Sequence, residues 1–235
     1  LLEYNVIWTG YANTIFYTAV VTVINLAMTI CCAYPLSRTD FMPRKVLLLL
    51  FMFTMYFSGG LIPNYLVVSK VGLLDTRWAM IVPGAISVYN MLVVRSYFMN
   101  SIPKELQEAA TLDGANIAQY LWKVVLPLSK PVLAVVGLYY GVSHWNDFYT
   151  ALLYIYDDDL LPLQSYLRNL LLTAQLTLNN TVGTSVGAAE IEALTKLEQT
   201  LKYSVIIVAA VPVLCIYPFI QKFFVKGIMI GSVKG

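Results

Sequence analysis

The sequence predicts an all-α membrane protein with several membrane-spanning helices. Of its 235 residues, 59% are apolar and only 12% are charged, about half the charged share of a soluble domain. The charges are also unevenly spaced. Segments without Asp, Glu, Lys or Arg cover residues 4–37, 46–69, 78–94, 131–146 and 203–221. A helix needs about 20 apolar residues to cross the hydrocarbon of a bilayer, so each segment approaches the length of one span.

The expected spans are residues 12–36, 45–62, 78–100, 130–150 and 203–224. Short loops rich in Lys and Arg stay in the cytoplasm, which fixes the orientation. If the first span runs from outside to inside, the cytoplasmic segments hold ten basic residues against four acidic ones, and the external segments hold five against nine. We therefore expect residues 1–235 to form a single transmembrane domain with a cytoplasmic C-terminus.

Helix-breaking residues interrupt two of these spans. Pro83-Gly84 lies inside the third, and Gly59-Gly60 with Pro63 closes the second. Broken helices at membrane depth are stable only where protein or a water-filled cavity covers the freed backbone groups. The pattern favours a translocation path, with an ordinary kink in a packed bundle as the alternative.

Several function classes find no support in the composition. The chain has one histidine and no cluster of histidines and cysteines, so the sequence shows no metal-site pattern. Its three cysteines, Cys31, Cys32 and Cys215, lie in apolar segments, and we interpret them as small core residues. His144 and Asp147 alone make a weak catalytic pair, so we expect no enzyme. The net charge of +2 gives no indication of nucleic acid.

The connection of residues 101–129, between the third and fourth spans, is too polar to cross the membrane. Residues 104–112 are good helix formers, and Asp113-Gly114 predicts a turn, because glycine adopts the left-handed conformation that stops a helix. A second short helix over 116–126 is expected to end at Pro127. The connection is thus a predicted cytoplasmic helix–turn–helix.

The first of these helices has small and apolar residues beside hydrogen-bond acceptors. Leu106, Ala109, Ala110 and Leu112 offer contact surface, and Glu105, Glu108 and Asp113 offer carboxylates. Small side chains let a partner approach closely. From the residues alone we interpret the connection as a docking element, with a solvated loop as the alternative.

The connection resembles the EAA loop of permease subunits of ATP-binding-cassette (ABC) importers. That pattern is Glu-Ala-Ala, three residues, Gly, nine residues, Ile, one residue, Leu-Pro; here Val124 replaces the Ile, a loss of one methylene. The resemblance implies an ATPase-coupling role for the matching positions and their neighbour in the turn: Glu108, Ala109, Ala110, Asp113, Gly114, Leu126 and Pro127.

Other segments are similar to the carbohydrate-uptake, maltose-type branch of these permeases, and to its subgroup for complex oligosaccharides and polysaccharides. They are Asn13-Thr14, Asp113-Gly114-Ala115, Trp145-Asn146-Asp147-Phe148, Tyr217-Pro218-Phe219 and residues 225–235. The resemblance implies a subunit of a binding-protein-dependent importer that moves a carbohydrate across a prokaryotic cell membrane. It also implies six spans, so that one N-terminal helix is missing here. A permease for an amino acid or another small polar solute, or an ATP-independent carrier, stays as the alternative.

The resemblance further implies partners. The sequence has no Gly-x-x-x-x-Gly-Lys-Ser/Thr phosphate loop, so we expect no cofactor in this chain and ATP with Mg²⁺ on separate subunits. The expected partners are a second, homologous permease subunit, two ABC ATPase subunits, an extracellular solute-binding protein, the carbohydrate and membrane lipid.

Candidate substrate contacts lie in the third and fourth spans. Sugar recognition needs aromatic faces beside hydrogen-bonding groups. The candidates are Tyr89, Asn90, Tyr140, Ser143, His144, Trp145, Asn146 and Asp147. Two other interpretations stay open: Trp145 belongs to an aromatic belt at the outer interface, and His144 is a packing residue. Because Asp147 would repel an acidic sugar, we expect a neutral one.

The external connection of residues 154–202 carries three consecutive acids, Asp157, Asp158 and Asp159, and a glycine-containing segment over 183–187. An acidic run is usually solvated surface. The resemblance instead implies a surface that faces the binding protein, with a loop able to reach into its cleft.

Overall fold

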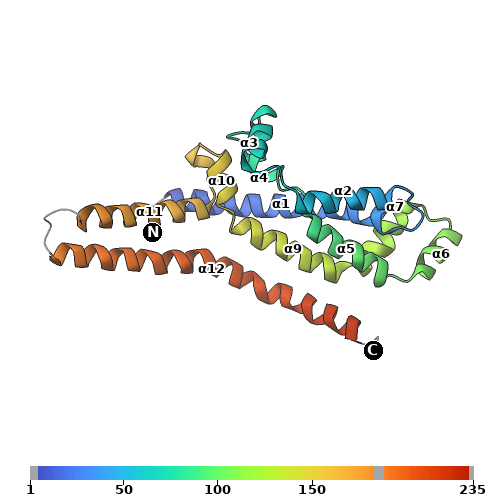
Figure 1. Cartoon of the computed structure of the whole chain (residues 1–235). Coiled ribbons are helices and arrows are strands. Elements are labelled where there is room, and N and C mark those ends of the chain that lie inside the picture. Colours follow the sequence, from blue (N-terminus) through green and yellow to red (C-terminus); the bar gives the residue numbers. More distant parts are fainter. Residues whose placement is uncertain (1–4, 183–187, 233–235) are drawn as a thin grey trace.

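The computed structural model describes residues 5–182 and 188–232, and every regular element in this part of the chain is helical (Figure 1). The elements are α1 (Asn5–Ser37), α2 (Arg44–Tyr56), α3 (Leu61–Lys70), α4 (Arg77–Ile81), α5 (Val88–Asn100), α6 (Lys104–Leu112), α7 (Ile117–Tyr120), the π-helical η1 (Leu121–Val125), α8 (Leu126–Leu128), α9 (Lys130–Trp145), α10 (Tyr149–Tyr154), the 3₁₀ turn η2 (Asp158–Leu160), α11 (Leu163–Val182) and α12 (Ala188–Ser232).

Two helices of the described chain are long and apolar enough to cross a membrane: Val6–Ser37 and Glu192–Cys215. Counting each sharply bent pair of helices as one span raises the number to four. These pairs are Arg44–Tyr56 with Leu61–Lys70, bent by 114°, and Ile117–Leu128 with Lys130–Trp145, bent by 79°. The all-helical membrane fold agrees with the sequence, and the expected count of five spans stays a prediction.

The predicted helix breaks are present. The helix expected over 45–62 ends at Tyr56, and Gly60, at φ +90°, starts α3 in a new direction. The span expected over 78–100 is divided into α4 and α5 by residues 82–87 around Pro83-Gly84. At this second break the N–H of Ser87 donates to the hydroxyl of Tyr140 over 3.1 Å. A side chain from α9 therefore satisfies one of the backbone groups that the break sets free.

The centre of the bundle is the contact of α1 with α5 and α9. Buried Ala33 and Leu36 of α1 meet Met91 and Val94 of α5 in one apolar cluster. Glycine allows the close approach of α9 to α1, since a Cβ on Gly137 would lie 3.3 Å from Leu26 Cδ1. The three helices form the frame on which the other elements are held.

The N-terminal half of α1 fixes the segment that leads into α11. Asn13 Nδ2 donates to the carbonyls of Asp159 (2.7 Å) and Leu161 (3.1 Å), and Thr14 Oγ1 accepts the N–H of Leu163 (2.8 Å). Asn13 and Thr14 are both buried. Buried polar groups are stable when hydrogen-bonded, so these contacts determine where α11 begins.

Helices α11 and α12 pack against each other at the end of the molecule opposite α6, and α12 then runs back along the bundle (Figure 1). The glycine-containing segment over 183–187, expected to be an external loop, lies outside the described residues. The cysteine interpretation was wrong in two cases: Cys31 and Cys215 are exposed on the chain surface because their helix faces are not covered by this chain.

Candidate coupling elbow and translocation cavity

We call residues 104–128, from the start of α6 to the end of α8, the elbow. Its first helix ends in a Schellman motif: the N–H of Ala115 donates to the carbonyl of Ala110 (2.9 Å), and that of Gly114 to the carbonyl of Thr111 (3.0 Å). Gly114 has φ +76°, a left-handed conformation that disfavours side chains. The predicted helix stop at Asp113-Gly114 is therefore present.

The second helix of the elbow begins with a capping box. The side chain of Asn116 accepts the N–H of Gln119 (2.8 Å), and the side chain of Gln119 accepts the N–H of Asn116 (2.9 Å). Only Asp113, Gly114 and Ala115 separate this cap from the end of α6. Both helix ends at the turn are thus satisfied within the chain, and the elbow is folded before any partner binds.

The end of the elbow differs from the expectation. The second helix was expected to stop at Pro127, but helical structure continues through α7, η1 and α8 to Leu128. Pro127 lies in the first turn of α8, where a missing N–H is tolerated. The chain bends at Ser129, whose N–H is shared by the carbonyls of Val125 (3.0 Å) and Leu126 (3.1 Å).

One side of the elbow is anchored and the other is open. Tyr120 and Val125 are buried in the cluster that contains α1 and α5. Glu108, Ala109 and Leu112 are exposed, and 89% of the Leu112 side chain is accessible. The open side thus presents a carboxylate, a small side chain and one exposed leucine.

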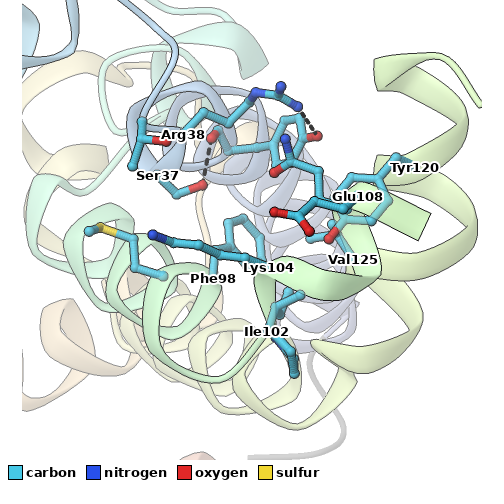
Figure 2. A pocket seen from close by; sticks show the side chains of 13 residues that line it. Ser37, Arg38, Phe98, Ile102, Lys104, Glu108, Tyr120 and Val125 are labelled. Carbon is cyan, nitrogen blue, oxygen red and sulfur yellow. Dashed lines mark hydrogen bonds between the residues drawn. The ribbon is translucent and has the colours of Figure 1, made fainter. Parts of the chain in front are cut away.

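A cavity of about 330 Å³ lies between the elbow and the end of α1. Figure 2 shows Lys104 and Glu108 on one side of it and Arg38 on the other. Arg38 donates to Asp40 (2.6 and 2.9 Å) and to the hydroxyl of Tyr34 (3.1 Å), and its guanidinium holds the pKa of the Asp40 carboxyl below its ordinary value. Among the described residues Glu108 has no ion-pair partner, so its carboxylate is available to another protein.

A second cavity, of about 230 Å³, lies beside the break between α4 and α5. Pro83 and Gly84 line it together with Asn64, His144 and Asp147. We call this the translocation cavity, after the path that the sequence predicts at this helix break. It brings two of the predicted substrate-path residues, His144 and Asp147, to the broken helix that the sequence singled out.

His144 also contacts a buried residue of α1. The side-chain amide of Asn25 lies 3.0 Å from its ring (Nδ2 to Nε2), and Asn25 Oδ1 is buried without a hydrogen-bond partner in the described part of the chain. In this orientation Nδ2 donates, so Nε2 accepts and the imidazole carries its proton on Nδ1. His144 therefore both packs against α1 and lines the translocation cavity.

The other substrate-path candidates lie elsewhere. Trp145 is 5% exposed and donates through Nε1 to the carbonyl of Ala209 (3.0 Å), which places it in the contact of α9 with α12. Its role at a sugar or in an interfacial belt stays a prediction. The hydroxyl of Tyr140 accepts the N–H of Ser87 at the break before α5.

Four candidates remain away from the translocation cavity. Tyr89, Ser143 and Asn146 are exposed, and Asn90 is buried in α5. None of the four lines the cavity. Ser143 and Asn146, three positions apart at the end of α9, share one side of the helix, and the role of these four residues as substrate contacts stays a prediction.

Comparison with known proteins agrees with this geometry. The sequence pattern of a family described as "Binding-protein-dependent transport system inner membrane component" matches residues 6–230. The chain belongs to this family.

Individual relatives cover nearly the whole chain. Protein LplC of Bacillus subtilis (strain 168) is 46% identical over 222 residues, which are 94% of this chain and 72% of LplC. The polygalacturonan/rhamnogalacturonan transport system permease protein YtcP of the same organism is 41% identical over 231 residues, 98% of this chain and 78% of YtcP. A solved bacterial ABC transporter involved in the import of the acidic polysaccharide alginate has a TM-score of 0.79 at 35% identity, over 95% of this chain and 77% of that one.

As a member of the binding-protein-dependent permeases, the chain is a membrane transport subunit and not an enzyme. Sequence reasoning missed two residues of its translocation cavity region, Asn25 and Asn64. Asn25 carried a usable signal, since an amide inside an apolar span is costly unless it has a partner. Asn64 carried none, because it follows a predicted helix break where polar residues are common.

Proposed function

We propose that this permease forms one half of the translocation path of an ATP-driven importer for saccharide chains, and that the elbow transmits the motion of a separate ATPase subunit. The observation that carries the proposal is the elbow itself. Both helix ends at its turn are capped, and it is anchored on one side by Tyr120 and Val125 and open on the other at Glu108, Ala109 and Leu112. A carrier that works without an ATPase would not need a structured projection with one side left open for a partner.

The proposed coupling works through two properties of the elbow. Its exposed face, with Glu108 and the small Ala109, enters a groove of the ATPase subunit, where the carboxylate meets a basic side chain or backbone N–H groups. Its buried face pushes on α1 and α5, because Tyr120 and Val125 share one packed cluster with Ala33 and Met91. Movement of the ATPase therefore tilts the bundle instead of bending a loop.

The saccharide class rests on the relatives. YtcP is named for polygalacturonan/rhamnogalacturonan, and the solved neighbour for alginate. Both names describe acidic polymers, although Asp147 favoured a neutral sugar. We therefore extend the proposed substrates to acidic saccharides.

The proposed substrate contacts of this half are the groups that line the translocation cavity. Asn64, His144 and Asp147 supply donors and acceptors there, and Tyr149 supplies an aromatic ring. At the same place the helix is interrupted at Pro83-Gly84, between α4 and α5. Hydroxyl groups of a passing sugar could exchange hydrogen bonds among these side chains.

The proposed layout has five spans in this chain, with the elbow and the C-terminus in the cytoplasm. The balance of basic and acidic residues supports this orientation. The C-terminal end of α12 lies toward the same end of the molecule as α6 (Figure 1), as the layout requires. The proposed assembly adds a homologous permease, two ATPase subunits that bind ATP with Mg²⁺, and an external solute-binding protein.

The test is uptake by the complete complex in proteoliposomes. Fluorescently labelled trigalacturonate and labelled maltotriose are offered with the solute-binding protein, in the presence of ATP or of a non-hydrolysable analogue. We expect accumulation of at least one saccharide with ATP only. Uptake of neither saccharide, or equal uptake without ATP hydrolysis, would refute the proposal, and labelled amino acids serve as the control solutes.

A further inference from the structure

A third cavity, of about 280 Å³, has no part in the elbow or the translocation cavity. It lies between α10, η2 and the first turns of α11, at the end of the molecule that the proposed orientation places outside. Its polar and aromatic walls are Phe148, Tyr156, Asp158, Ser165, Arg168 and Asn169. Its volume is at the low end of small-molecule pockets, which suits one sugar ring rather than a chain.

Arg168 is held in place at this cavity. Its guanidinium carbon lies 5.3 Å from the ring centroid of Phe148, within cation–π range. The contact orients the N–H groups of Arg168 before any ligand arrives.

Tyr156 is held from the other side. Its hydroxyl lies 2.7 Å from that of Tyr65, and its N–H donates to Asp75 Oδ1 over 2.8 Å. Asp75 adopts φ +55°, uncommon for this residue type, and donates its own N–H to the carbonyl of Tyr154 (2.8 Å). Two segments far apart in sequence thus lock one aromatic wall of the cavity, and a preformed wall lowers the entropy cost of binding.

The remaining lining groups match the hydroxyls of a sugar. Ser165 is 7% exposed, and its Oγ has no hydrogen-bond partner among the residues described here. Asp158 and Asn169 add a carboxylate and an amide to the lining, so that the cavity offers both donors and acceptors. The neighbouring Asp157 and Asp159 make the surroundings acidic, which favours recognition of hydroxyl groups over a carboxylate.

We propose that this cavity is an external saccharide subsite, which binds one ring by stacking on Tyr156 and by hydrogen bonds from Arg168 and Asn169 to its hydroxyls. The inference rests on the proposed function for the class of ligand. It adds a contact outside the translocation cavity, at the place where a sugar released by the binding protein first meets the permease.

The test measures binding of trigalacturonate and of maltotriose to the complete complex in nanodiscs, without the solute-binding protein, by saturation-transfer difference NMR. Arg168→Gln is expected to weaken binding about tenfold, the loss typical of one hydrogen bond to a charged group. Asn169→Ala, at an exposed position, provides a second variant that leaves the fold intact. The matched control is Arg77→Gln, which removes an equivalent contact of a guanidinium with Phe16 (5.1 Å) away from the cavity.

The outcomes separate this subsite from the proposed function. If the wild-type complex imports a saccharide but Arg168→Gln and Asn169→Ala bind it as tightly as Arg77→Gln does, the subsite is refuted and the importer stands. If Arg168→Gln instead weakens stimulation of the ATPase by sugar-free binding protein, the cavity receives a protein side chain and the subsite is refuted as well. If the wild-type complex imports no saccharide, the proposed function is refuted, whatever the variants bind.

Discussion

The hydroxyl oxygen of Tyr140 lies 2.8 Å from Oγ1 of Thr29, between α9 and α1. The same hydroxyl accepts the N–H of Ser87, directly before α5. One oxygen atom therefore connects the three helices of the central bundle at the point where the expected third span is broken. Because Tyr140 and Thr29 are both buried, water cannot replace these bonds if the hydroxyl is lost.

Removal of this hydroxyl should destabilise the bundle. Tyr140→Phe leaves Thr29 Oγ1 and the Ser87 N–H without their partner, and we expect a loss of about 1–3 kcal/mol in the free energy of unfolding. Tyr139→Phe is the matched control, since Tyr139 is 49% exposed. Denaturant unfolding of the purified permease, followed by tryptophan fluorescence, measures both. Equal stability of the two variants would show that the hydroxyl is not structural.

A tryptophan at Gly114 should separate docking from folding. A Cβ added at Gly114 has no atom within 4 Å, so the chain itself leaves room, and only the left-handed backbone costs about 1–2 kcal/mol. Gly72 has the same properties, with φ +75° and nothing within 4 Å, in the loop after α3. We expect Gly114→Trp to abolish ATP-driven uptake and Gly72→Trp to retain it. Similar uptake by both variants would remove the docking role of the elbow.

The charge of Glu108 should matter for transport and not for stability. It makes no ion pair in the described chain and is exposed, so Glu108→Gln is expected to leave the unfolding free energy within about 0.5 kcal/mol of the wild type. Uptake should fall at least about tenfold, the effect of losing one charge-assisted hydrogen bond, while the isolated ATPase still hydrolyses ATP. Glu105→Gln, on the same helix, should behave as the wild type. A coupled, fully active Glu108→Gln complex would contradict this role.

The translocation cavity should close when Gly84 acquires a side chain. A Cβ there would lie 3.7 Å from His144 Cε1, an ordinary contact, so Gly84→Val is expected to fold and to fill part of the cavity. We expect the maximal rate of saccharide uptake to fall, with binding-protein-stimulated ATP hydrolysis retained. Ala85→Val, next in the chain but outside the cavity, is the control. Uptake at the wild-type rate by Gly84→Val would place the path elsewhere.

The sequence predicted those features that depend on neighbouring residues. The elbow illustrates this, because Gly114 stops α6 through its own backbone and Asn116 caps α7 through a residue three positions later. Pro83-Gly84 likewise broke the helix where expected. Local chemistry was enough in each case, since no distant contact competes with it.

The substrate-path candidates were less predictable, because their positions depend on packing between helices. His144, Trp145, Asn146 and Asp147 are adjacent in sequence, yet two line the translocation cavity, one is buried against α12 and one is exposed. Composition alone could not separate them. The partner of His144, Asn25, is 119 residues away in the chain, a pairing that only the assembled bundle defines.

Helix α12 contains 45 residues, so at 1.5 Å per residue it is roughly 68 Å long, more than twice the ~30 Å of hydrocarbon in a bilayer. The helix is therefore longer than one crossing needs, and it also packs against α11 and α9. Pro212 and Pro218 lie inside this helix, and an interior proline removes a backbone hydrogen bond and bends the helix. In a helix of this length, a small change of the bend at either proline displaces one end by several ångströms relative to the other.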